Sequence, residues 1–358
     1  MKKVFIITDV DFWVGGAGHR MRISSLVEFL NASSNLTIGY IGLIDIETEN
    51  YLNSYINAKF YFFEKYKHLD LNSYGLALRE YLKNNFFDVF IIEYIHNSYL
   101  LNYIDSDSKF ILDVHDIISD RIKEFKKFGY KDKIFQISKK TELQIFNVFD
   151  KVIFLCEIDC NKIKAIINPE KVLLCPHPAV AVKIHRIRVE VKNIVFIASE
   201  YTPNKDGILH FIENCWPELI KNFNVHLLLY GNICNVIKLP NYKNIFLKGY
   251  CSNIAEAYEQ ADIIINPVRF GAGLKIKNIE ALANGIPLVT TTHGARGLEN
   301  GIDKAFLVAN TAQGFISSLS RLIISVNLRK KLSKKAILYI NSKFSVKNCF
   351  EPLLDEIK

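Results

Sequence analysis

The stretch NPVRFGAGLKIKNIEALANGIPLVTTTHGARGL, residues 266–298, decides the fold class. An apolar run ends at Pro267, a turn with two glycines follows, and a helical pattern runs from about Leu274 to Asn284. Gly285 ends this helix, and another apolar run comes directly after it. This order of strand, loop, helix and strand predicts one crossover unit of a parallel sheet.

Outward from this unit, short apolar runs rich in Val, Ile and Phe alternate with helical patterns, which predicts an α/β protein. The two halves of the chain each supply enough runs for a doubly wound, Rossmann-like parallel sheet. The expected strands are 4–8, 36–44, 59–63, 89–94, 109–114 and 151–156 in the first half, and 193–199, 225–231, 244–249, 261–267, 286–292 and 305–310 in the second.

The boundary between the two halves is expected at about 177–192, where prolines follow a strand and an alternating polar stretch leads to the next apolar run. The expected domains are therefore 1–178 and 179–340, followed by a C-terminal helix in 341–358. Doubly wound sheets bind ligands at the carboxyl ends of their strands, so we expect the two domains to face a common cleft.

The composition is that of an ordinary globular protein, with 358 residues of which 49% are hydrophobic and 23% charged. No run reaches the roughly 18 uncharged apolar residues of a membrane-spanning helix, and the opening MKKVFIITDVDFW is typical of a first strand rather than a signal peptide. We therefore expect a cytoplasmic protein. The seven cysteines are scattered and form no C-x-x-C pair, which argues against a disulfide framework and a zinc site.

The formal net charge of +8 is unevenly distributed, because acidic and basic residues nearly balance over residues 1–180. A basic second half favours nucleic acid, an anionic membrane surface or a phosphorylated ligand as partner. No nucleic-acid-binding motif accompanies the charge, so we expect no nucleic acid partner.

The loop before the helix that starts near Leu274 has the features of an anion site. Gly271 and Gly273, on either side of Ala272, lack the Cβ that would keep a ligand from the backbone. The first amides of the following helix are unpaired and partly positive, so this corner is suited to phosphate.

Charged side chains surround this corner. Arg269, Lys275 and Lys277 can neutralise a diphosphate, and Glu280, one turn further, can accept two hydrogen bonds from ribose hydroxyls. The alternative is that Lys277 and Glu280 form a solvated i, i+3 ion pair.

Two features of the first half are further candidates. Gly15, Gly16 and Gly18 follow the first strand and precede the helix that contains Arg22. There they would let a substrate approach the backbone closely. The alternative is that they only form a tight turn. His115 follows the strand 109–114, where an open sheet presents a ligand-facing imidazole; a histidine hydrogen-bonded within its own loop is the alternative.

Metal binding is not expected. No pair of histidines has a metal-ligand spacing in a helical context. The carboxylate pairs Asp9/Asp11 and Asp105/Asp107 are more typical of structural turns.

The block 266–298 resembles the donor-nucleotide signature of glycosyltransferase family 4, in the subgroup with a G-A-G-x-K-x-K-x-x-E version. IASEYTPNKDGILHFI (197–212) resembles the opening of that subgroup's second domain, with P-N-x-D-G. GYCSNIAEAYEQADIIINP (249–267) resembles its G-x-x-x-x-(I/L)-x-x-x-Y-x-x-A-D strand. In the first half, WVGGAGHRMRISSLVEFL (13–30) resembles the family's glycine loop, and LDVHD (112–116) its histidine motif.

The sequence departs from the family's pattern at two places. Many members have two glutamates eight positions apart, but the position eight before Glu280 is Ala272. The usual arginine and lysine just after the first strand of the second domain are replaced by residues 200–206.

The resemblance implies the GT-B fold, with an acceptor-binding domain first, a nucleotide-sugar domain second, and a C-terminal helix that crosses back to the first domain. It implies transfer of a hexose-type unit from a nucleotide diphosphate sugar to an acceptor hydroxyl, with retention of configuration and without a metal or other cofactor. The acceptor would be a glycan, lipid-linked or protein-borne, in glycan, cell-surface polysaccharide or glycoconjugate biosynthesis.

The residues that the resemblance assigns fall into three groups. The catalytic group is His115, Lys277 and Glu280; the donor-binding group is Asn204, Arg269, Gly271, Ala272, Gly273, Leu274 and Lys275; the acceptor loop is Gly15, Gly16, Gly18 and Arg22. Two alternatives stay open. One is a non-catalytic nucleotide-sugar-binding partner subunit, which Ala272 favours, and the other is a GT-B sugar epimerase.

The stretch KEFKKFGYKDKIFQISKK (123–140) has seven lysines against Glu124 and Asp132, interleaved with aromatic and aliphatic residues. Such a mixture docks on anionic bilayers, which predicts peripheral contact with the inner face of the membrane. The alternative is a solvated helical face over a normal core.

Overall fold

The computed structural model describes residues 1–55, 58–63, 70–131, 135–182, 187–238, 243–251 and 253–358. They form two compact units, each of which is described by itself. Unit 1 comprises Met1–Gly15, His19–His177 and Cys349–Lys358, and unit 2 comprises Gly16–Gly18 and Pro178–Asn348. The expected linker at 177–192 includes residues 183–186, which lie outside the described residues.

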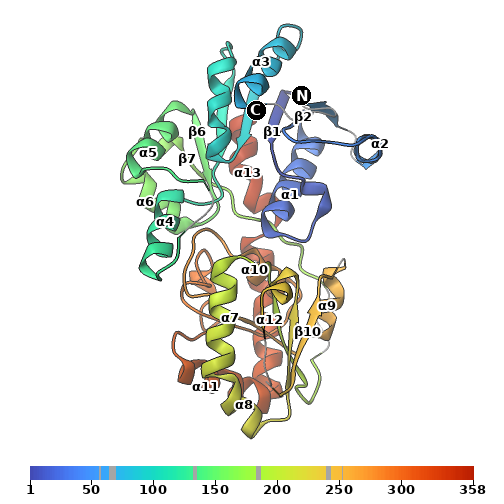
Figure 1. Ribbon diagram of the computed structural model, residues 1–358, viewed down its shortest axis with the longest axis vertical. Helices are drawn as coiled ribbons and strands as arrows, with labels where there is room; N and C mark the ends of the chain where they lie inside the picture. The colour runs from blue at the N-terminus through green and yellow to red at the C-terminus, as the bar shows by residue number, and fades with distance from the viewer. Residues whose placement is uncertain (56–57, 64–69, 132–134, 183–186, 239–242, 252) are drawn as a thin grey trace. The chain divides into compact units, whose positions relative to one another are not determined.

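Unit 1 contains, within its described residues, a parallel sheet of seven strands in the order β3-β2-β1-β4-β5-β6-β7 (Figure 1). The strands are β1 (Lys3–Thr8), β2 (Asn35–Tyr40), β3 (Lys59–Phe62), β4 (Val89–Glu93), β5 (Lys109–Asp113), β6 (Lys151–Phe154) and β7 (Val172–Leu174). The helices are α1 (Gly18–Ser33), α2 (Ile46–Tyr55), α3 (Leu71–Leu82), α4 (Ile118–Lys127), α5 (Lys139–Val148), α6 (Glu157–Lys164) and the C-terminal α13 (Val346–Ile357).

Unit 2 contains, in the part of it that is described, a parallel sheet of six strands in the order β10-β9-β8-β11-β12-β13. The strands are β8 (Asn193–Ile197), β9 (His226–Tyr230), β10 (Ile245–Gly249), β11 (Ile263–Asn266), β12 (Leu288–Thr290) and β13 (Leu307–Val308). The helices are α7 (Thr202–Asn214), α8 (Trp216–Asn222), α9 (Ile254–Gln260), α10 (Ile276–Ala283), α11 (Ala312–Ile324) and α12 (Val326–Lys343).

The predicted fold class, two doubly wound parallel-sheet domains, is confirmed. Every apolar run that was predicted as a strand contains one. Central strands such as β4 are buried along their whole length, whereas the edge strand β10 is mostly exposed. Several strands are shorter than predicted. For example, β2 was expected to reach residue 44 but ends at Tyr40, because its pairing with β1 and β3 stops at Tyr40. The three-residue β7 was not among the predicted runs.

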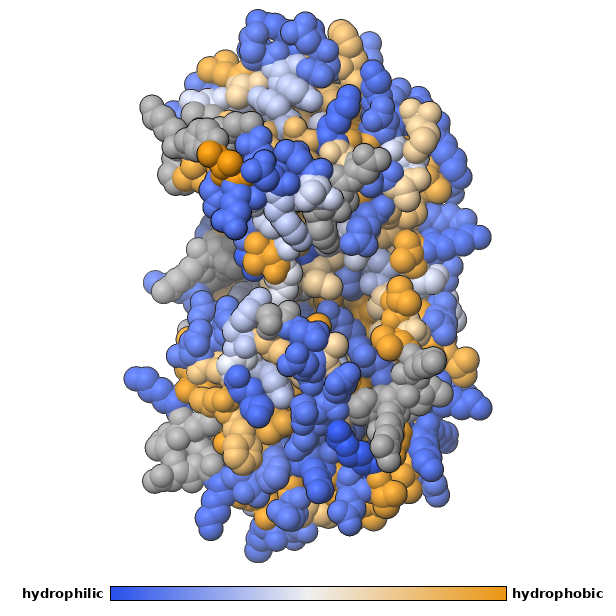
Figure 2. Space-filling view, turned by 90° about the vertical axis from the view of Figure 1, so that its right-hand side faces the viewer, coloured by the Kyte–Doolittle hydropathy of each residue, from blue (hydrophilic) through white to orange (hydrophobic). Residues whose placement is uncertain are grey.

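The core of each unit lies between its sheet and its helices. In unit 2 the buried Trp216 and Phe211 pack with Ile194 and Leu227 of the sheet. On the surface, hydrophobic residues are scattered among hydrophilic ones on the face in Figure 2. Among the described residues, no helix is long and apolar enough to span a bilayer.

The sheet order decides which chain segments can share a site. In unit 1, β1, β4 and β5 are neighbours, so the residues that follow these strands lie along one edge of the sheet. In unit 2 the same holds for the residues that follow β8, β11 and β12. The predicted site residues come from these segments.

Candidate functional site

The glycine loop of unit 2 connects β11 to α10. Gly271 and Gly273 have φ values of 113° and 68°, a left-handed backbone that favours glycine. Lys275 donates hydrogen bonds from Nζ to the carbonyl oxygens of Ala272 (2.8 Å) and Gly273 (2.9 Å). Its ammonium therefore stabilises the shape of the loop, whereas the sequence suggested a phosphate contact. Leu274 is buried beneath the loop.

A buried polar network fixes α10 against the sheet. Asn266 Nδ2 donates to Asn278 Oδ1 (2.9 Å), and Asn278 Nδ2 donates to the carbonyl oxygen of Gly294 (2.7 Å). A Cβ on Gly294 would lie only 2.1 Å from Thr290 Oγ1, so a larger residue has no room there. Sequence reasoning missed this network, although an asparagine within the apolar run of β11 and another within the helix were its signal.

The P-N-x-D-G stretch lies against the loop at Asp206 and Gly207. Asp206 forms two hydrogen bonds with Arg269, from Nε (2.9 Å) and from Nη2 (2.8 Å). Gly207 is required because a Cβ there would lie 2.6 Å from the carbonyl oxygen of Pro267. Asn204 donates to the carbonyl oxygen of Ser199 at 3.1 Å. The charge of Arg269, predicted for a diphosphate, is thus balanced by Asp206.

Lys277 differs from the other two basic residues of this site. Its Nζ donates to Asn204 Oδ1 at 2.8 Å and lies 4.6 Å from the centroid of the Phe196 ring. Among the described residues it takes part in no ion pair within 4.0 Å. Burial, and then the charge of Lys275, lower the pKa of Lys277 to about 7, although the charge of Glu280 acts in the opposite direction.

Glu280 accepts a hydrogen bond from the buried hydroxyl of Tyr258 at 2.8 Å. Burial raises the pKa of Glu280 above its ordinary value, although the Tyr258 hydroxyl and the charge of Lys277 lower it in part. Lys277 is thus hydrogen-bonded to Asn204, and Glu280 is hydrogen-bonded to Tyr258. The alternative of a simple i, i+3 ion pair between Lys277 and Glu280 is not formed. Sequence reasoning did not assign Tyr258 to the site.

In unit 1, His115 follows β5 with a φ of 57°, and Tyr94 follows the adjacent β4 with a φ of 63°. Their rings are stacked with centroids 4.2 Å apart. His115 Nε2 lies 2.7 Å from Glu93 Oε2 and 4.0 Å from Asp113 Oδ1. Left-handed backbone at two non-glycine residues is strained, and such strain concentrates at functional sites.

Arg22, predicted in the acceptor loop, lies beneath it with a completely buried side chain. Nη2 donates to Asp113 Oδ2 at 3.0 Å, and Nη1 donates to the carbonyl oxygen of Pro176 at 3.2 Å. Of the loop itself, Gly15 and Gly16 adopt left-handed backbone, and Gly18 begins α1.

Glu93, Asp113 and His115 each offer a metal-ligating atom, and these atoms lie within 4.8 Å of one another. Within this cluster, the guanidinium of Arg22 already places a cation against Asp113. Burial and the charge of Asp113 raise the pKa of Glu93 to about 7, against the lowering effect of His115.

A second polar group lies at the same edge of the unit 1 sheet. Asp9, after β1, lies 2.7 Å from His96 Nε2 and accepts a hydrogen bond from Asn97 at 3.0 Å. Asp11 pairs with Arg20 through two hydrogen bonds. The first of the two carboxylate pairs, Asp9 and Asp11, is thus engaged with side chains of unit 1.

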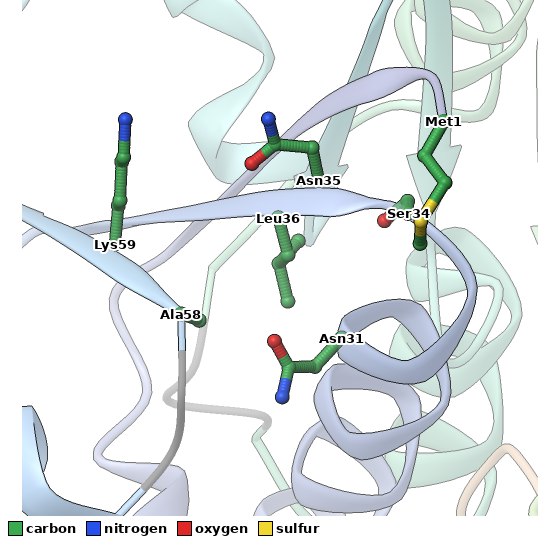
Figure 3. Close-up of a pocket in the computed structure, with 7 residues that line it drawn as sticks. All are labelled: Met1, Asn31, Ser34, Asn35, Leu36, Ala58 and Lys59. Carbon is green, nitrogen blue, oxygen red and sulfur yellow. The ribbon is translucent and has the colours of Figure 1, made fainter.

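A pocket of about 590 Å³ lies elsewhere in unit 1 (Figure 3). Its lining residues come from the end of α1 and from the starts of the first three strands: Met1, Asn31, Ser34, Asn35, Leu36, Ala58 and Lys59. Ligands of parallel sheets bind at the carboxyl ends of strands, so this pocket does not mark the predicted site.

The apolar residues of the stretch 123–140 differ in burial. Phe125 is buried, and Ile137 packs against the hydrophobic core of unit 1. Tyr130 and Phe135 are 38% and 40% exposed. The six described lysines of the stretch are exposed. Asp132, Lys133 and Ile134 lie outside the described residues.

Part of the chain matches a known protein family, and solved structures share its fold. Residues 191–325 match the family described as "Glycosyl transferases group 1". A crystal structure of TarM superposes with a TM-score of 0.77 and 15% identity over 100% of this chain and 99% of that chain. Anabaena HepE, in complex with UDP and glucose, gives a TM-score of 0.72 and 12% identity over 100% of this chain and 99% of that chain.

The chain has the GT-B fold. The family match and these neighbours support a glycosyltransferase. A protein of Klebsiella pneumoniae named "Uncharacterized 44.6 kDa protein in cps region" is 24% identical over 395 aligned residues, which cover 99% of this chain and 100% of that protein.

Proposed function

We propose that this protein is a retaining glycosyltransferase that moves a hexose-type sugar from a nucleoside diphosphate sugar to an acceptor hydroxyl during synthesis of a cell-surface polysaccharide. One observation carries the donor site: the partly buried ammonium of Lys277 is bonded to a neutral amide and has a pKa lowered to about 7. A buried ammonium without an anionic partner is strongly stabilised when an anionic ligand binds next to it, because the ligand provides the negative charge that the surrounding protein groups do not.

The diphosphate would lie against the left-handed turn of Gly271 and Gly273 and the amino terminus of α10. The backbone there is open to close approach, and the first amides of the helix point outward. Lys277 would supply the main positive charge, and Lys275 would act by holding the loop carbonyls. Charge that develops on the departing diphosphate would then be stabilised by groups that are already in place.

Glu280 would orient the ribose. It lies one turn after Lys277, and the Tyr258 hydroxyl fixes one of its oxygens. A carboxylate with its other oxygen available can accept hydrogen bonds from neighbouring hydroxyls.

The proposed reaction needs no metal ion, because Lys277 and the helix terminus would provide the positive charge that a divalent cation supplies in other transferases. This proposal concerns the donor site in unit 2. In unit 1, His115 would contact the transferred sugar or the acceptor.

The acceptor class is inferred from two relatives. The Klebsiella protein is named for a cps region, and a structure of S. aureus TarM was solved with fondaparinux, alpha-GlcNAc-glycerol and UDP. These names support a glycan or glycosylated polymer as acceptor of this protein, and a uridine nucleotide as the first donor to test.

The test is a donor screen with UDP-, GDP-, ADP- and CDP-linked sugars, read by thermal shift and by release of nucleoside diphosphate. We expect one class to stabilise the wild type and to be turned over, with binding weakened in Lys277→Met and kept in Lys221→Met, an exposed lysine on α8. No stabilisation by any donor would contradict the proposal. Binding without release would instead support the partner subunit that Ala272 favours, and a new sugar isomer would support the epimerase.

A further inference from the structure

Arg22 joins four segments of unit 1 that are far apart in the sequence. It extends from α1 to Asp113 at the end of β5 and to the carbonyl oxygen of Pro176, and its guanidinium lies 4.8 Å from the centroid of the Phe350 ring. The chain leaves unit 1 after His177 and returns to it at Cys349. Arg22 therefore contacts both of these segments and β5 at once.

From Arg22, charged groups alternate in sign up to the imidazole of His115. The guanidinium is 3.0 Å from Asp113, the other oxygen of Asp113 is 4.0 Å from His115 Nε2, and that nitrogen is 2.7 Å from Glu93. The side chains of Arg22, Asp113 and Glu93 are fully buried, and that of His115 is 9% exposed. With water excluded, each charge acts strongly on the next.

The hydrogen bonding of this group is incomplete. Among the described residues, Arg22 Nε, Asp113 Oδ1 and Glu93 Oε1 are buried without a hydrogen-bond partner. Buried polar atoms are normally hydrogen-bonded, so a group that leaves three of them unpaired is destabilising, and such a cost is typical of groups with a functional role. The paired atoms connect Arg22 to Asp113 and to the carbonyl oxygen of Pro176, and Glu93 to His115.

We propose that Arg22 and Asp113 are positioning residues that set the protonation state and ring orientation of His115. The importance of His115 for transfer rests on the proposed function, but the effect on its protonation does not. With Nε2 facing Glu93, the Nδ1 side of the ring is the one that remains for a ligand.

The two positioning residues act on His115 in opposite directions. Burial lowers the pKa of His115, but the charge of Asp113 and the carboxylate of Glu93 together raise it by more than burial lowers it. The net pKa of His115 therefore lies above its ordinary value. The charge of Arg22 opposes this rise. Further titratable groups lie close enough to interact with this cluster, among them Tyr94, His19, His177, Cys175 and Cys349. Burial, together with the charges of Arg22 and His115, lowers the pKa of His177 to about 3, so His177 stays neutral.

The experiment is a histidine titration by NMR in the presence of EDTA, with the His115 signal identified by its loss in His115→Gln. We expect Arg22→Met to raise the pKa of His115 and Asp113→Asn to lower it by more, because the charge of Asp113 is the larger of the two effects. Arg22→Lys, which keeps the charge, should stay within about half a unit of the wild type. Arg20→Met, the same change two residues earlier in α1, is the matched control and should leave the pKa of His115 unchanged.

Shifts of opposite sign are the result that a purely structural Arg22 cannot give. Shifts in the same direction, or none in folded variants, would overturn the proposal. If Arg22→Met does not fold, Asp113→Asn decides alone: a fall in the pKa of His115 supports the proposal and an unchanged value overturns it. Since no nucleotide is present, failure of the donor screen and failure of this inference are separate outcomes.

Discussion

Donor binding should be coupled to protonation of Lys277, and this coupling can be measured through the pH dependence of affinity. The pKa of Lys277 is about 7 in the free protein, so about half of the molecules carry the ammonium at pH 7. A bound diphosphate favours the charged form, which raises this pKa. Above pH 7, each binding event must therefore take up a proton, and affinity should fall as pH rises.

The size of the effect follows from the pKa. Once Lys277 is mostly neutral, affinity falls about tenfold per pH unit, which corresponds to about 1.4 kcal/mol. From pH 7 to pH 9 the protonated fraction falls from about one half to about one hundredth, so Kd should rise about 50-fold. UDP-glucose is the suitable ligand, because its diphosphate lacks the terminal phosphate whose ionisation near pH 6 would confuse the analysis.

The assay is isothermal calorimetry at pH 6, 7, 8 and 9, repeated in two buffers with different ionisation enthalpies to count the protons taken up. Lys277→Met should bind more weakly at pH 7 and lose the pH dependence, whereas Lys221→Met should retain both affinity and dependence. Affinity that is constant from pH 7 to pH 9 would refute the reasoning. The same slope in Lys277→Met would assign the proton to another group.

Three further predictions concern the ribose, the metal and the membrane. Glu280→Gln should weaken binding of UDP by about tenfold, the loss of one charge-assisted hydrogen bond, and should hardly affect 2′,3′-dideoxy-UDP; equal losses by calorimetry would place Glu280 away from the ribose. Turnover should be the same with and without EDTA, and rescue of a chelated enzyme by Mg²⁺ or Mn²⁺ would show that a metal is needed. The wild type should co-sediment with anionic vesicles at low salt and be released by salt, since each lysine near such a surface contributes about 1 kcal/mol. A variant with Lys126, Lys127 and Lys131 changed to Glu should stay in the supernatant. Equal sedimentation of the two proteins would exclude the stretch 123–140 as the membrane contact.

The fold could be predicted from the sequence because its main signal is local. Strands such as β4, with the sequence VFIIE, are buried along their whole length, so each produces an unbroken apolar run. The ends of strands could not be predicted in the same way. Ile41 and Ile44 are apolar and buried but lie beyond the end of β2, because strand length depends on where the neighbouring strands stop.

Spacing can group candidate site residues only where they are close in sequence. The left-handed glycines, Lys277 and Glu280 lie within ten positions, so spacing alone groups them as a candidate site. Asn204, which accepts a hydrogen bond from Lys277, was predicted only through the family resemblance, and Tyr258, which donates one to Glu280, was not assigned to the site. Both come from other helices, and no periodicity connects them to α10. Tertiary packing decides which polar groups meet, and sequence spacing does not contain this information.

The same limit explains why the basic residues of the predicted site are not equivalent. In the sequence, Arg22, Arg269, Lys275 and Lys277 are all cations next to glycine loops. In the structure, Asp113 and Asp206 balance the two arginines, and loop carbonyls receive Lys275. A cation that is already balanced gains little from an added anion, because binding must first weaken the existing pair. Loss of activity on removing Arg269 would therefore report the unpaired carboxylate of Asp206, whereas the pH dependence that Lys277 imposes reports the ligand itself.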